Sequence, residues 1–279
     1  MDTATEMKSI LITGCSTGIG AHLARCLKDQ GYRVFATARR QADVNKLKDE
    51  GFESLLLDLS SSDSIKSAIN DLFQKTESLY ALINNGAYGQ AGALEDISRA
   101  AMEEQFQANF FGWHELTNLV LPSMKSQKKG RIIYISSVLG FVALPFRGAY
   151  IASKYALEGL VDTLRLELRN TNIKLSLVQP GPIESNFRKN AYLSFQKHVD
   201  FSNSDYQEDY ERMIKRLNSP NNAKYTLGPE AVLKPVLHAL ESRSPKLRYW
   251  VTFPTKLFAI LGRILPSIWM DKILCKAAD

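Results

Sequence analysis

The sequence predicts an α/β fold in a single domain: a doubly wound, parallel seven-stranded sheet flanked by helices. Two observations carry this prediction. Seven apolar runs of five to seven residues alternate along the 279-residue chain with segments of helical periodicity. The runs are largely continuous in their apolar character, as expected for strands of a parallel sheet that helices cover on both faces. Right-handed crossovers between such strands build a doubly wound sheet.

The predicted elements follow in order from the N-terminus. Strands are predicted for the runs SILIT (9–13), RVFAT (33–37), ESLLLD (53–58), YALIN (80–84), RIIYIS (131–136), IKLSLVQ (173–179) and LRYWV (247–251). Helices are predicted for residues 18–30, 41–50, 62–76, 98–126, 149–170 and 229–242. The first helix shows the reasoning, because Ile19, Leu23 and Leu27 fall on one helical face.

Two segments depart from this alternation. Residues 183–228 are polar and aromatic by turns, and we expect a long loop that forms a substrate lid or a disordered insertion. Residues 253–278 mix apolar side chains with basic ones such as Lys256, Arg263 and Lys272, which predicts an amphipathic segment. Packing on its own domain or on a second subunit is the favoured interpretation, and contact with a membrane surface is the alternative.

The composition narrows the class of protein. Hydrophobic residues make up 45% and charged residues 23% of the chain, as in an ordinary globular protein, and the net charge of +6 does not indicate a nucleic-acid partner. Three cysteines without CxxC spacing predict no disulfide framework and no metal site, and favour a reducing, cytoplasmic location. The N-terminal MDTATEMKS is polar and too short for a secretory signal. Near the C-terminus, Pro254, Arg263 and Pro266 interrupt the apolar stretches.

A glycine-rich turn follows the first predicted strand in ILITGCSTGIG (10–20). Gly14, Gly18 and Gly20 form the pattern G-x-x-x-G-x-G between a strand and a helix. Glycines in such a turn let the backbone approach a pyrophosphate, which then lies at the helix N-terminus. An ordinary tight turn is the alternative, and the strand-to-helix context favours a dinucleotide site.

The second predicted strand indicates which dinucleotide would bind. An NAD site usually has an acidic residue about 20 positions after the turn, which holds the ribose 2′-hydroxyl. Here ATARR (36–40) contains no acid but ends in Arg39 and Arg40. A guanidinium suits a 2′-phosphate through forked, charge-assisted hydrogen bonds, and Ser16 and Thr17 could add hydroxyl donors. The pattern favours NADP(H) over NAD(H), and two solvated surface arginines are the alternative.

Four polar residues further along the chain form a second pattern. Tyr150 and Lys154 are four positions apart, so both side chains project from one face of the predicted helix. Ser137 follows the predicted fifth strand, at the carboxyl edge where doubly wound sheets bind ligands. Asn109 lies in the long preceding helix, within ANFFG.

Taken together, these motifs resemble the short-chain dehydrogenase/reductase family. The family's order is reproduced by TGCSTGIG (13–20), NNGA (84–87), NFFG (109–112), SS (136–137), YIASK (150–154) and PGPIES (180–185), which span residues 9–185 with their first strand. The chain is most similar to the 17-beta-hydroxysteroid and retinol dehydrogenase-like branch. Within that branch, the segments GCSTGIG, NFFG, SKYALEG, PGPI and TLGPEAV resemble bacterial NADP-dependent aldehyde reductases.

The resemblance implies a Rossmann fold and a role for each motif residue. Tyr150 would be the general acid/base at the substrate oxygen, Lys154 would lower its pKa and hold the nicotinamide ribose, and Ser137 would hydrogen-bond the substrate oxygen. Asn109 would hold a water in a proton relay behind Lys154. The implied cofactor contacts are Gly14, Ser16, Thr17, Gly18, Ile19, Gly20, Arg39, Asp58, Leu59, Asn85, Gly86, Ala87, Tyr150, Lys154, Pro180, Gly181, Ile183 and Ser185.

The magnitudes are compatible with this chemistry. A lysine ammonium at about 4 Å, in an effective dielectric near 20, contributes roughly 4 kcal/mol, or up to about 3 pKa units. This would bring the pKa of Tyr150 from about 10 to about 7, which suits general acid–base catalysis. The chain departs from the family at Gly86-Ala87, where Ala-Gly is usual. Small residues at both positions should preserve the close approach to the cofactor.

The expected function is an NADP-dependent oxidoreductase. It would transfer a hydride between nicotinamide and a small apolar carbonyl or alcohol, such as an aldehyde, a ketone, or a retinoid- or steroid-like compound. An NAD-linked alcohol or hydroxysteroid dehydrogenase and a non-catalytic dinucleotide-binding sensor stay open as alternatives. A homodimer or homotetramer is also expected.

Overall fold

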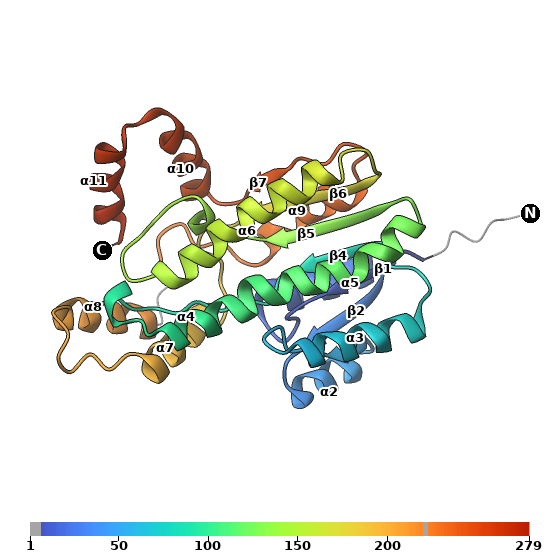
Figure 1. The fold of residues 1–279 in the computed structure, drawn as a ribbon, viewed down its shortest axis with the longest axis horizontal. Helices are drawn as coiled ribbons and strands as arrows, with labels where there is room; N and C mark the ends of the chain where they lie inside the picture. Colours follow the sequence, from blue (N-terminus) through green and yellow to red (C-terminus); the bar gives the residue numbers. More distant parts are fainter. Residues whose placement is uncertain (1–6, 220–222, 279) are drawn as a thin grey trace, which may run out of the picture.

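Seven strands form one parallel sheet within the described residues, which confirms the predicted doubly wound fold (Figure 1). The computed structural model describes residues 7–219 and 223–278. Residues 1–6 of the N-terminal segment, residues 220–222 of the predicted lid and Asp279 lie outside the described part. The strands are β1 (Ser9–Ile12), β2 (Arg33–Ala38), β3 (Glu53–Leu56), β4 (Ala81–Asn84), β5 (Gly130–Ile135), β6 (Ile173–Gln179) and β7 (Arg248–Trp250).

The strand order is β3-β2-β1-β4-β5-β6-β7, and every neighbouring pair is parallel. The chain therefore winds outward from β1 to β3, returns to the middle, and winds outward the other way from β4 to β7. Ile12 of β1 pairs with Ile83 of β4, so the loops after these two strands start at the same level. A doubly wound sheet binds its ligand at this change of direction, beyond the carboxyl ends of the strands.

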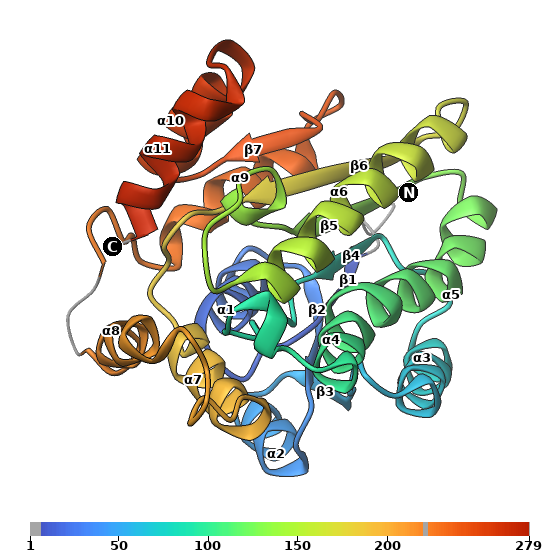
Figure 2. The same cartoon turned by 60° about the vertical axis from the view of Figure 1, so that its left-hand side comes forward.

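Helices cover both faces of the sheet (Figures 1 and 2). One face carries α1 (Gly18–Asp29), α2 (Gln41–Asp49) and α9 (Glu230–Glu241), and the other carries α3 (Ser62–Lys75), α5 (Gly112–Ser126) and α6 (Gly148–Glu167). In β1, Leu11 packs into the α3–α5–α6 core, whereas Ile10 and Ile12 pack into the opposite core. All three are fully buried, and each contributes roughly 1.5–3 kcal/mol. Burial on both faces is the reason that the strands are continuous apolar runs.

The predicted helix over 98–126 changes pitch in its middle. After α4 (Arg99–Phe106), a π-helical turn spans Gln107–Phe111, and α5 begins at Gly112. Short π-helical turns often occur at functional sites. Two single-turn 3₁₀ helices complete this part of the chain, η1 (Leu94–Asp96) and η3 (Val138–Gly140).

The prediction of a loop over 183–228 is wrong for most of that segment. It forms two helices, α7 (Phe187–His198) and α8 (Gln207–Asn218), at the end of the molecule toward which the strands point (Figure 1). The aromatic side chains Phe195 and Tyr210 are buried in a small core between them and the loop after β4. The helices are therefore held by tertiary contacts of their own.

The signal for α8 was present in the sequence. Tyr206, Tyr210, Met213 and Leu217 recur at helical spacing; Tyr210 and Met213 are buried in the small core, and Tyr206 and Leu217 pack against it. Charged residues dominate the rest of the helix, so this spacing alone did not distinguish a packed helix from a polar loop. Whether α7 and α8 act as a lid stays a prediction.

The predicted amphipathic segment 253–278 forms two helices side by side, α10 (Phe253–Ile264) and α11 (Ser267–Ala278), which we call the C-terminal hairpin (Figure 2). Met270 and Leu274 of α11 pack against Val142, in the segment after η3. Within the described part of the chain, no helix combines the length and the apolar character needed to cross a bilayer.

Replacing Gly112 by alanine tests the packing of the long helix against the loop after β3. A Cβ on Gly112 would lie 2.0 Å from the carbonyl oxygen of Leu59, so the backbone must shift. We expect G112A to lower the free energy of unfolding by roughly 2–3 kcal/mol in urea titrations.

The matched control is Gly159→Ala on α6, where no atom lies within 4 Å of the added Cβ. This variant should gain about 0.5–1 kcal/mol, because alanine is the better helix former. Similar unfolding midpoints for the two variants would contradict the packing described here.

Candidate active site

The glycine-rich turn after β1 lies against the loop after β4. Gly14 and Gly18 have φ values of 71° and 61°, in the left-handed region that favours glycine. A Cβ on Gly14 would lie 2.6 Å from the Cα of Gly86, and one on Gly20 would lie 2.3 Å from the carbonyl oxygen of Gly14. Conformation and close packing therefore both require glycine in this turn.

Helix α1 begins directly after the turn with an uncapped first turn. Thr17 is the N-cap residue, yet its side chain makes no capping hydrogen bond. Ser16 and Thr17 are exposed, and Gly18 and Ile19 are half-buried. The first N–H groups of a helix have no intrahelical partners and carry the positive end of its dipole, so this end suits a phosphate group.

Hydrogen bonds tie this turn to the loop after β4. The hydroxyl of Thr13 accepts from the backbone N–H groups of Asn85 at 2.8 Å and Gly86 at 2.9 Å. The Asn85 amide donates to the carbonyl oxygens of Thr13 at 2.8 Å and Gly14 at 3.2 Å. Asn85 therefore positions the turn, and the cofactor contact expected for it stays a prediction.

The Gly86-Ala87 order fits this junction. A Cβ on Gly86 would lie 3.1 Å from Cδ1 of Leu59 and 3.3 Å from the backbone nitrogen of Gly14. Alanine here would be tight without overlapping the backbone, so the usual family order and the order of this chain can both keep the close approach. The departure at these positions leaves the junction intact.

The two arginines at the end of β2 differ in their contacts. Both are exposed, but Arg40 forms an ion pair with Asp43 at 2.7 Å. Within the described residues, the Arg39 guanidinium has no hydrogen bond or ion pair, which leaves it available to a ligand.

After β3, the carboxylate of Asp58 accepts hydrogen bonds from the backbone N–H of Ser60 at 2.9 Å and from the Ser60 hydroxyl at 2.7 Å.

Tyr150 lies near the start of α6 and is almost completely buried. Its ring packs edge-on against Phe187 with centroids 5.2 Å apart. Burial raises the pKa of Tyr150 to about 12, and a side-chain hydrogen bond with Ser137 acts in the opposite direction. The Ser137 hydroxyl also accepts from the N–H of Leu139 at 3.1 Å, so its position is held by η3.

Lys154 lies one turn further along α6 and is only 1% exposed. Its Nζ donates to the carbonyl oxygen of Ile135 at 3.0 Å and lies 4.1 Å from the centroid of the Trp113 ring. Burial lowers the pKa of Lys154 to about 7, against the attraction of Glu158, which raises it. The ammonium is thus held by one carbonyl and one aromatic face.

The expected pKa near 7 for Tyr150 is not found in this structure. Burial of the phenol is the main influence, and it acts toward a higher pKa. Lys154 directs its Nζ to Ile135 and Trp113 and lies 5.7 Å from the centroid of the Tyr150 ring. The pKa of Lys154, and not that of Tyr150, lies near neutrality. Burial removes more hydration free energy from the ammonium than its contacts with Ile135 and Trp113 restore.

Asn109 lies in the π-helical turn and is fully buried. Its side chain pairs with the backbone of Tyr88, accepting from the N–H at 3.2 Å and donating to the carbonyl oxygen at 2.8 Å. The amide therefore holds the loop after β4. The relay role that the resemblance implies for Asn109 stays a prediction.

A buried carboxylate behind Lys154 was not singled out in the sequence. Glu158, one helical turn after Lys154, accepts from the Ser136 hydroxyl at 2.6 Å and from the Gln179 amide at 2.9 Å. Arg248 of β7 donates to its other oxygen at 3.0 Å. The spacing of four residues after Lys154 was the available signal, but only the fold shows that this carboxylate faces inward.

The segment after β6 closes over the site. The carbonyl oxygen of Pro180 accepts from the N–H of Val138 at 2.8 Å. A Cβ on Gly181 would lie 2.2 Å from the Thr252 hydroxyl, and one on Gly18 would lie 2.9 Å from Cβ of Ser185. Residues 180–185, which contain several predicted cofactor contacts, therefore reach from the end of β5 to the glycine-rich turn.

Ile183, in the middle of this segment, forms an isolated parallel bridge with Leu227. Phe187 follows at the start of α7 and packs over Tyr150 and Gly89, where an added Cβ would lie 2.7 Å from the Phe187 ring. Sequence reasoning missed Phe187, since nothing in its neighbourhood marks it until α7 is placed.

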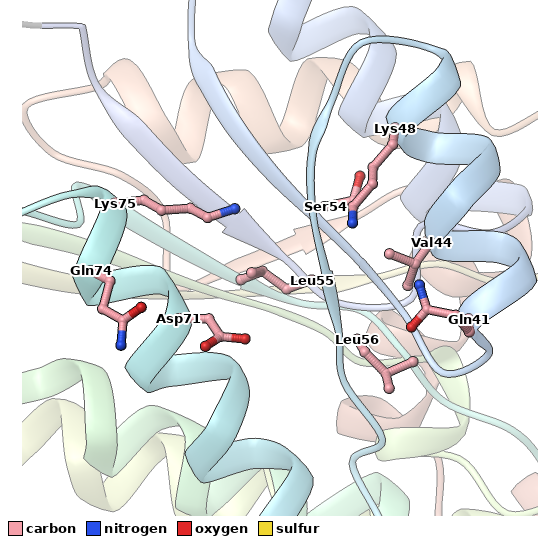
Figure 3. Close-up of a pocket in the computed structure, with 9 residues that line it drawn as sticks. All are labelled: Gln41, Val44, Lys48, Ser54, Leu55, Leu56, Asp71, Gln74 and Lys75. Atoms are coloured by element: carbon pink, nitrogen blue, oxygen red, sulfur yellow. The ribbon is translucent and has the colours of Figure 1, made fainter.

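One surface depression lies behind the site and is lined by Glu158, Gln179 and Arg248, among others. A depression of about 240 Å³ lies between α2, β3 and α3 and is lined by Lys48, Asp71 and Lys75, among others (Figure 3). None of the predicted site residues lines it, so it has no evident part in the chemistry. Within residues 7–219 and 223–278, no cluster of three or more His, Cys, Asp or Glu side chains could hold a metal ion.

A model of the family described as short chain dehydrogenase matches residues 8–194. The chain belongs to the short-chain dehydrogenase family. It is 46% identical over 269 residues to the uncharacterized oxidoreductase YbbO of Escherichia coli, which covers 96% of this chain and 94% of that protein. Both observations make the protein an oxidoreductase by family.

Two further relatives support the similarity to the retinol dehydrogenase-like branch. Retinol dehydrogenase 8 of Bos taurus is 34% identical over 259 residues, covering 88% of this chain and 81% of that protein. The 3-ketodihydrosphingosine reductase of Bacteroides thetaiotaomicron is 35% identical over 207 residues, covering 74% of each chain.

Solved structures of the family share the fold. A short-chain dehydrogenase/reductase from Burkholderia phymatum in complex with NAD superposes with a TM-score of 0.77 at 22% identity, covering 91% of this chain and 92% of that one. A short-chain dehydrogenase from Burkholderia cenocepacia in complex with NADP gives 0.75 at 21% identity, covering 96% and 98%. The family thus includes members bound to either cofactor.

The residues of this chain fit a nicotinamide dinucleotide. The first turn of α1 has no side-chain cap, and the glycine-rich turn before it leaves no space for side chains. The Arg39 guanidinium, which has no partner among the described residues, follows directly after β2, next to β1 in the sheet. Together they offer backbone N–H groups and the Arg39 guanidinium to an anionic ligand.

Lys154→Met tests whether burial lowers the pKa of this lysine. Its pKa is lowered on folding from 10.5 to about 7, so between these values the unfolded chain binds the additional proton. Stability therefore rises with pH through this window, and the contribution of Lys154 is lost as the pH falls toward 7. We expect the Tm of the unmodified chain to rise with pH more steeply than that of K154M. The two proteins have all other titrating groups in common. Parallel curves of Tm against pH would therefore contradict a lowered pKa for the buried lysine.

Proposed function

We propose that the protein is an NADP(H)-preferring carbonyl reductase, with NAD(H) as the alternative cofactor. Its substrate would be an apolar aldehyde or ketone, or in the reverse direction the matching alcohol. The observation that carries the proposal is the arrangement of Ser137, Tyr150 and Lys154 at the carboxyl edge of the sheet, beside the glycine-rich turn.

Tyr150 acts as the general acid in this proposal. A reduced nicotinamide, when bound, would supply the hydride to the carbonyl carbon. With a pKa of about 12, the phenol is protonated at neutral pH and ready to give its proton to the forming alkoxide, a much stronger base than a phenolate. The Ser137 hydroxyl lies beside Tyr150 and would donate a hydrogen bond to the same oxygen. The high pKa therefore keeps Tyr150 in the protonated form that a general acid requires near neutrality.

Lys154 then has two roles. One of its N–H groups is used by the Ile135 carbonyl, which leaves others to hold ribose hydroxyls of the cofactor. Its pKa of about 7 lets it gain and lose a proton near neutral pH, as reprotonation of Tyr150 requires. Asn109 would assist this relay from the π-helical turn on the neighbouring helix.

The cofactor contacts follow from the two loops at the centre of the sheet. Backbone groups of residues 14–20 would hold the pyrophosphate at the start of α1, and Asp58 and Leu59 would border the adenine. Arg39 would bind the 2′-phosphate of NADP(H), because it is exposed and unpaired whereas Arg40 is engaged by Asp43. Ser185, which packs against Gly18, would close the site over the phosphates.

The substrate is proposed to be apolar and extended. Phe187 packs on the Tyr150 ring, so a substrate at Tyr150 would meet an aromatic wall from the predicted lid. Two relatives are named for retinol and 3-ketodihydrosphingosine, compounds with long apolar chains. Both observations support a lipid-like carbonyl compound or alcohol.

Assembly and location complete the proposal. Phe111, Tyr155 and Leu166 are exposed apolar side chains on the α5–α6 side of the sheet, which supports a homodimer or homotetramer. The three cysteines are free, as they would be in the cytoplasm.

Tyr150→Phe tests the proposed acid. We expect a loss of kcat of about 10²- to 10⁴-fold in NADPH-dependent reduction, because the ring is kept while its proton is removed. Cofactor affinity, measured by calorimetry, should be unchanged. A chain that binds NADPH but reduces no member of an aldehyde, ketone, steroid and retinoid panel would instead support a dinucleotide-binding sensor.

Arg39→Ala tests the choice of cofactor. We expect the Kd for NADPH to rise by about 10- to 100-fold, the loss typical of charge-assisted hydrogen bonds, while the Kd for NADH stays constant. Arg40→Ala is the matched control, since its guanidinium is paired with Asp43 and should leave both values unchanged. Equal effects of the two variants on NADPH would contradict a specific role for Arg39.

A further inference from the structure

The C-terminal hairpin presents an apolar face to the outside of the molecule. On α10 the exposed apolar residues recur at helical spacing, so they form one stripe. On α11, Ile268 and Trp269 lie away from Met270 and Leu274, which pack on the domain, and Ile273 borders the packed side. This apolar face consists of Phe253, Leu257, Ile260, Ile264, Ile268, Trp269 and Ile273.

The exposure is greatest around the turn between the two helices. Ile264 is 70%, Ile268 is 65% and Trp269 is 63% exposed. Such values are unusual for large apolar side chains that are close together on a globular surface. Packing on its own domain, the favoured interpretation from the sequence, therefore accounts for the inner face of the hairpin only.

Basic residues lie beside this face on α10 and within it on α11. Lys256 and Arg263 border the stripe of α10, and Lys272 and Lys276 lie among the exposed apolar residues of α11. Asp271 is the single acidic residue between positions 253 and 278, which gives the segment a net charge of +3. A basic amphipathic helix with an interfacial tryptophan is typical of proteins that bind anionic lipid surfaces.

A second copy of the chain fits this face less well. A twofold interface brings the same patch of both subunits together, so a segment of charge +3 would meet its own copy. Like charges brought together at an interface oppose association. The surface of a bilayer with anionic lipids offers the complementary sign along the whole hairpin.

The dimensions suit a position on the membrane surface. Each helix has 12 residues and is about 18 Å long, well short of the roughly 30 Å of a bilayer core. The hairpin would therefore lie in the headgroup region with its apolar side chains directed toward the acyl chains.

We propose that the C-terminal hairpin binds the surface of bilayers that contain anionic lipids. The apolar face enters the boundary between headgroups and acyl chains, and Lys256, Lys272 and Lys276 face the lipid phosphates, whereas the Arg263 guanidinium lies over the Trp250 ring. Docking in this way brings the active-site end of the sheet to the membrane, because α11 packs on the segment of Val138, Phe141 and Val142 that follows Ser137. Binding itself does not depend on the proposed oxidoreductase activity.

Flotation of the full chain with lipid vesicles tests the proposal. We expect the chain to float with vesicles of phosphatidylcholine and phosphatidylglycerol, and to float much less with phosphatidylcholine alone or at high salt. Ile264→Ser/Trp269→Ser, which changes no charge, should lower the partition coefficient by about tenfold or more. Lys272→Gln/Lys276→Gln should lower it for anionic vesicles only.

The matched control is Leu56→Ser/Leu193→Ser, which removes two exposed leucines elsewhere on the surface. It should float like the unmodified chain. Sedimentation velocity of the same proteins measures their assembly. Absence of flotation by the unmodified chain, or equal flotation of the Ile264/Trp269 variant, would overturn the proposal. Dissociation of an oligomer by that variant without any vesicle binding would assign the apolar face to a second copy instead.

Discussion

The close contact between the turn after β1 and the loop after β4 is the constraint on which the site depends. Gly14 and Gly86 approach so closely that neither the turn nor α1 could hold its place with larger side chains at position 14. Hydrogen bonds between Thr13 and Asn85 fix the contact. They satisfy backbone groups that would otherwise need water as a partner. The start of α1 is thereby brought to the carboxyl edge of the sheet, where an anion can reach its free N–H groups.

This contact is coupled to the candidate catalytic residues through Trp113. The indole N–H donates to the carbonyl oxygen of Gly86 at 2.9 Å, and the face of the same ring supports the ammonium of Lys154. Asn109 holds the neighbouring part of the loop through Tyr88. The loops proposed to hold the cofactor and the residues proposed to transfer the proton therefore belong to one connected network of contacts. A displacement of the loops would also displace the proton-transfer residues.

Burial sets the protonation states of that core. Desolvation acts on Tyr150 and Lys154 in opposite directions, because the phenol is charged when deprotonated and the amine when protonated. Both groups are thereby biased toward their neutral forms. Simple Coulomb reasoning from the spacing of Tyr150 and Lys154 gave the opposite result for the tyrosine, since it assumed a direct approach of the ammonium. The ammonium instead points to Ile135 and Trp113.

The sequence by itself determined the fold and the approximate place of each candidate residue. Continuous apolar runs that alternate with helical segments are typical of strands buried on both faces, and the glycine-rich pattern between a strand and a helix predicted the tight turn in which Gly14 and Gly18 adopt positive φ values. Only the tertiary structure decided the helices of 183–228, the inward-facing Glu158, the wall formed by Phe187 and the exposed apolar face of the C-terminal hairpin. Local pattern records the preference of a segment for a helix or strand and for burial. The surface against which a helix packs and the groups that orient a buried charge come from residues far away in the chain. The same distant residues decide whether an apolar stripe is covered.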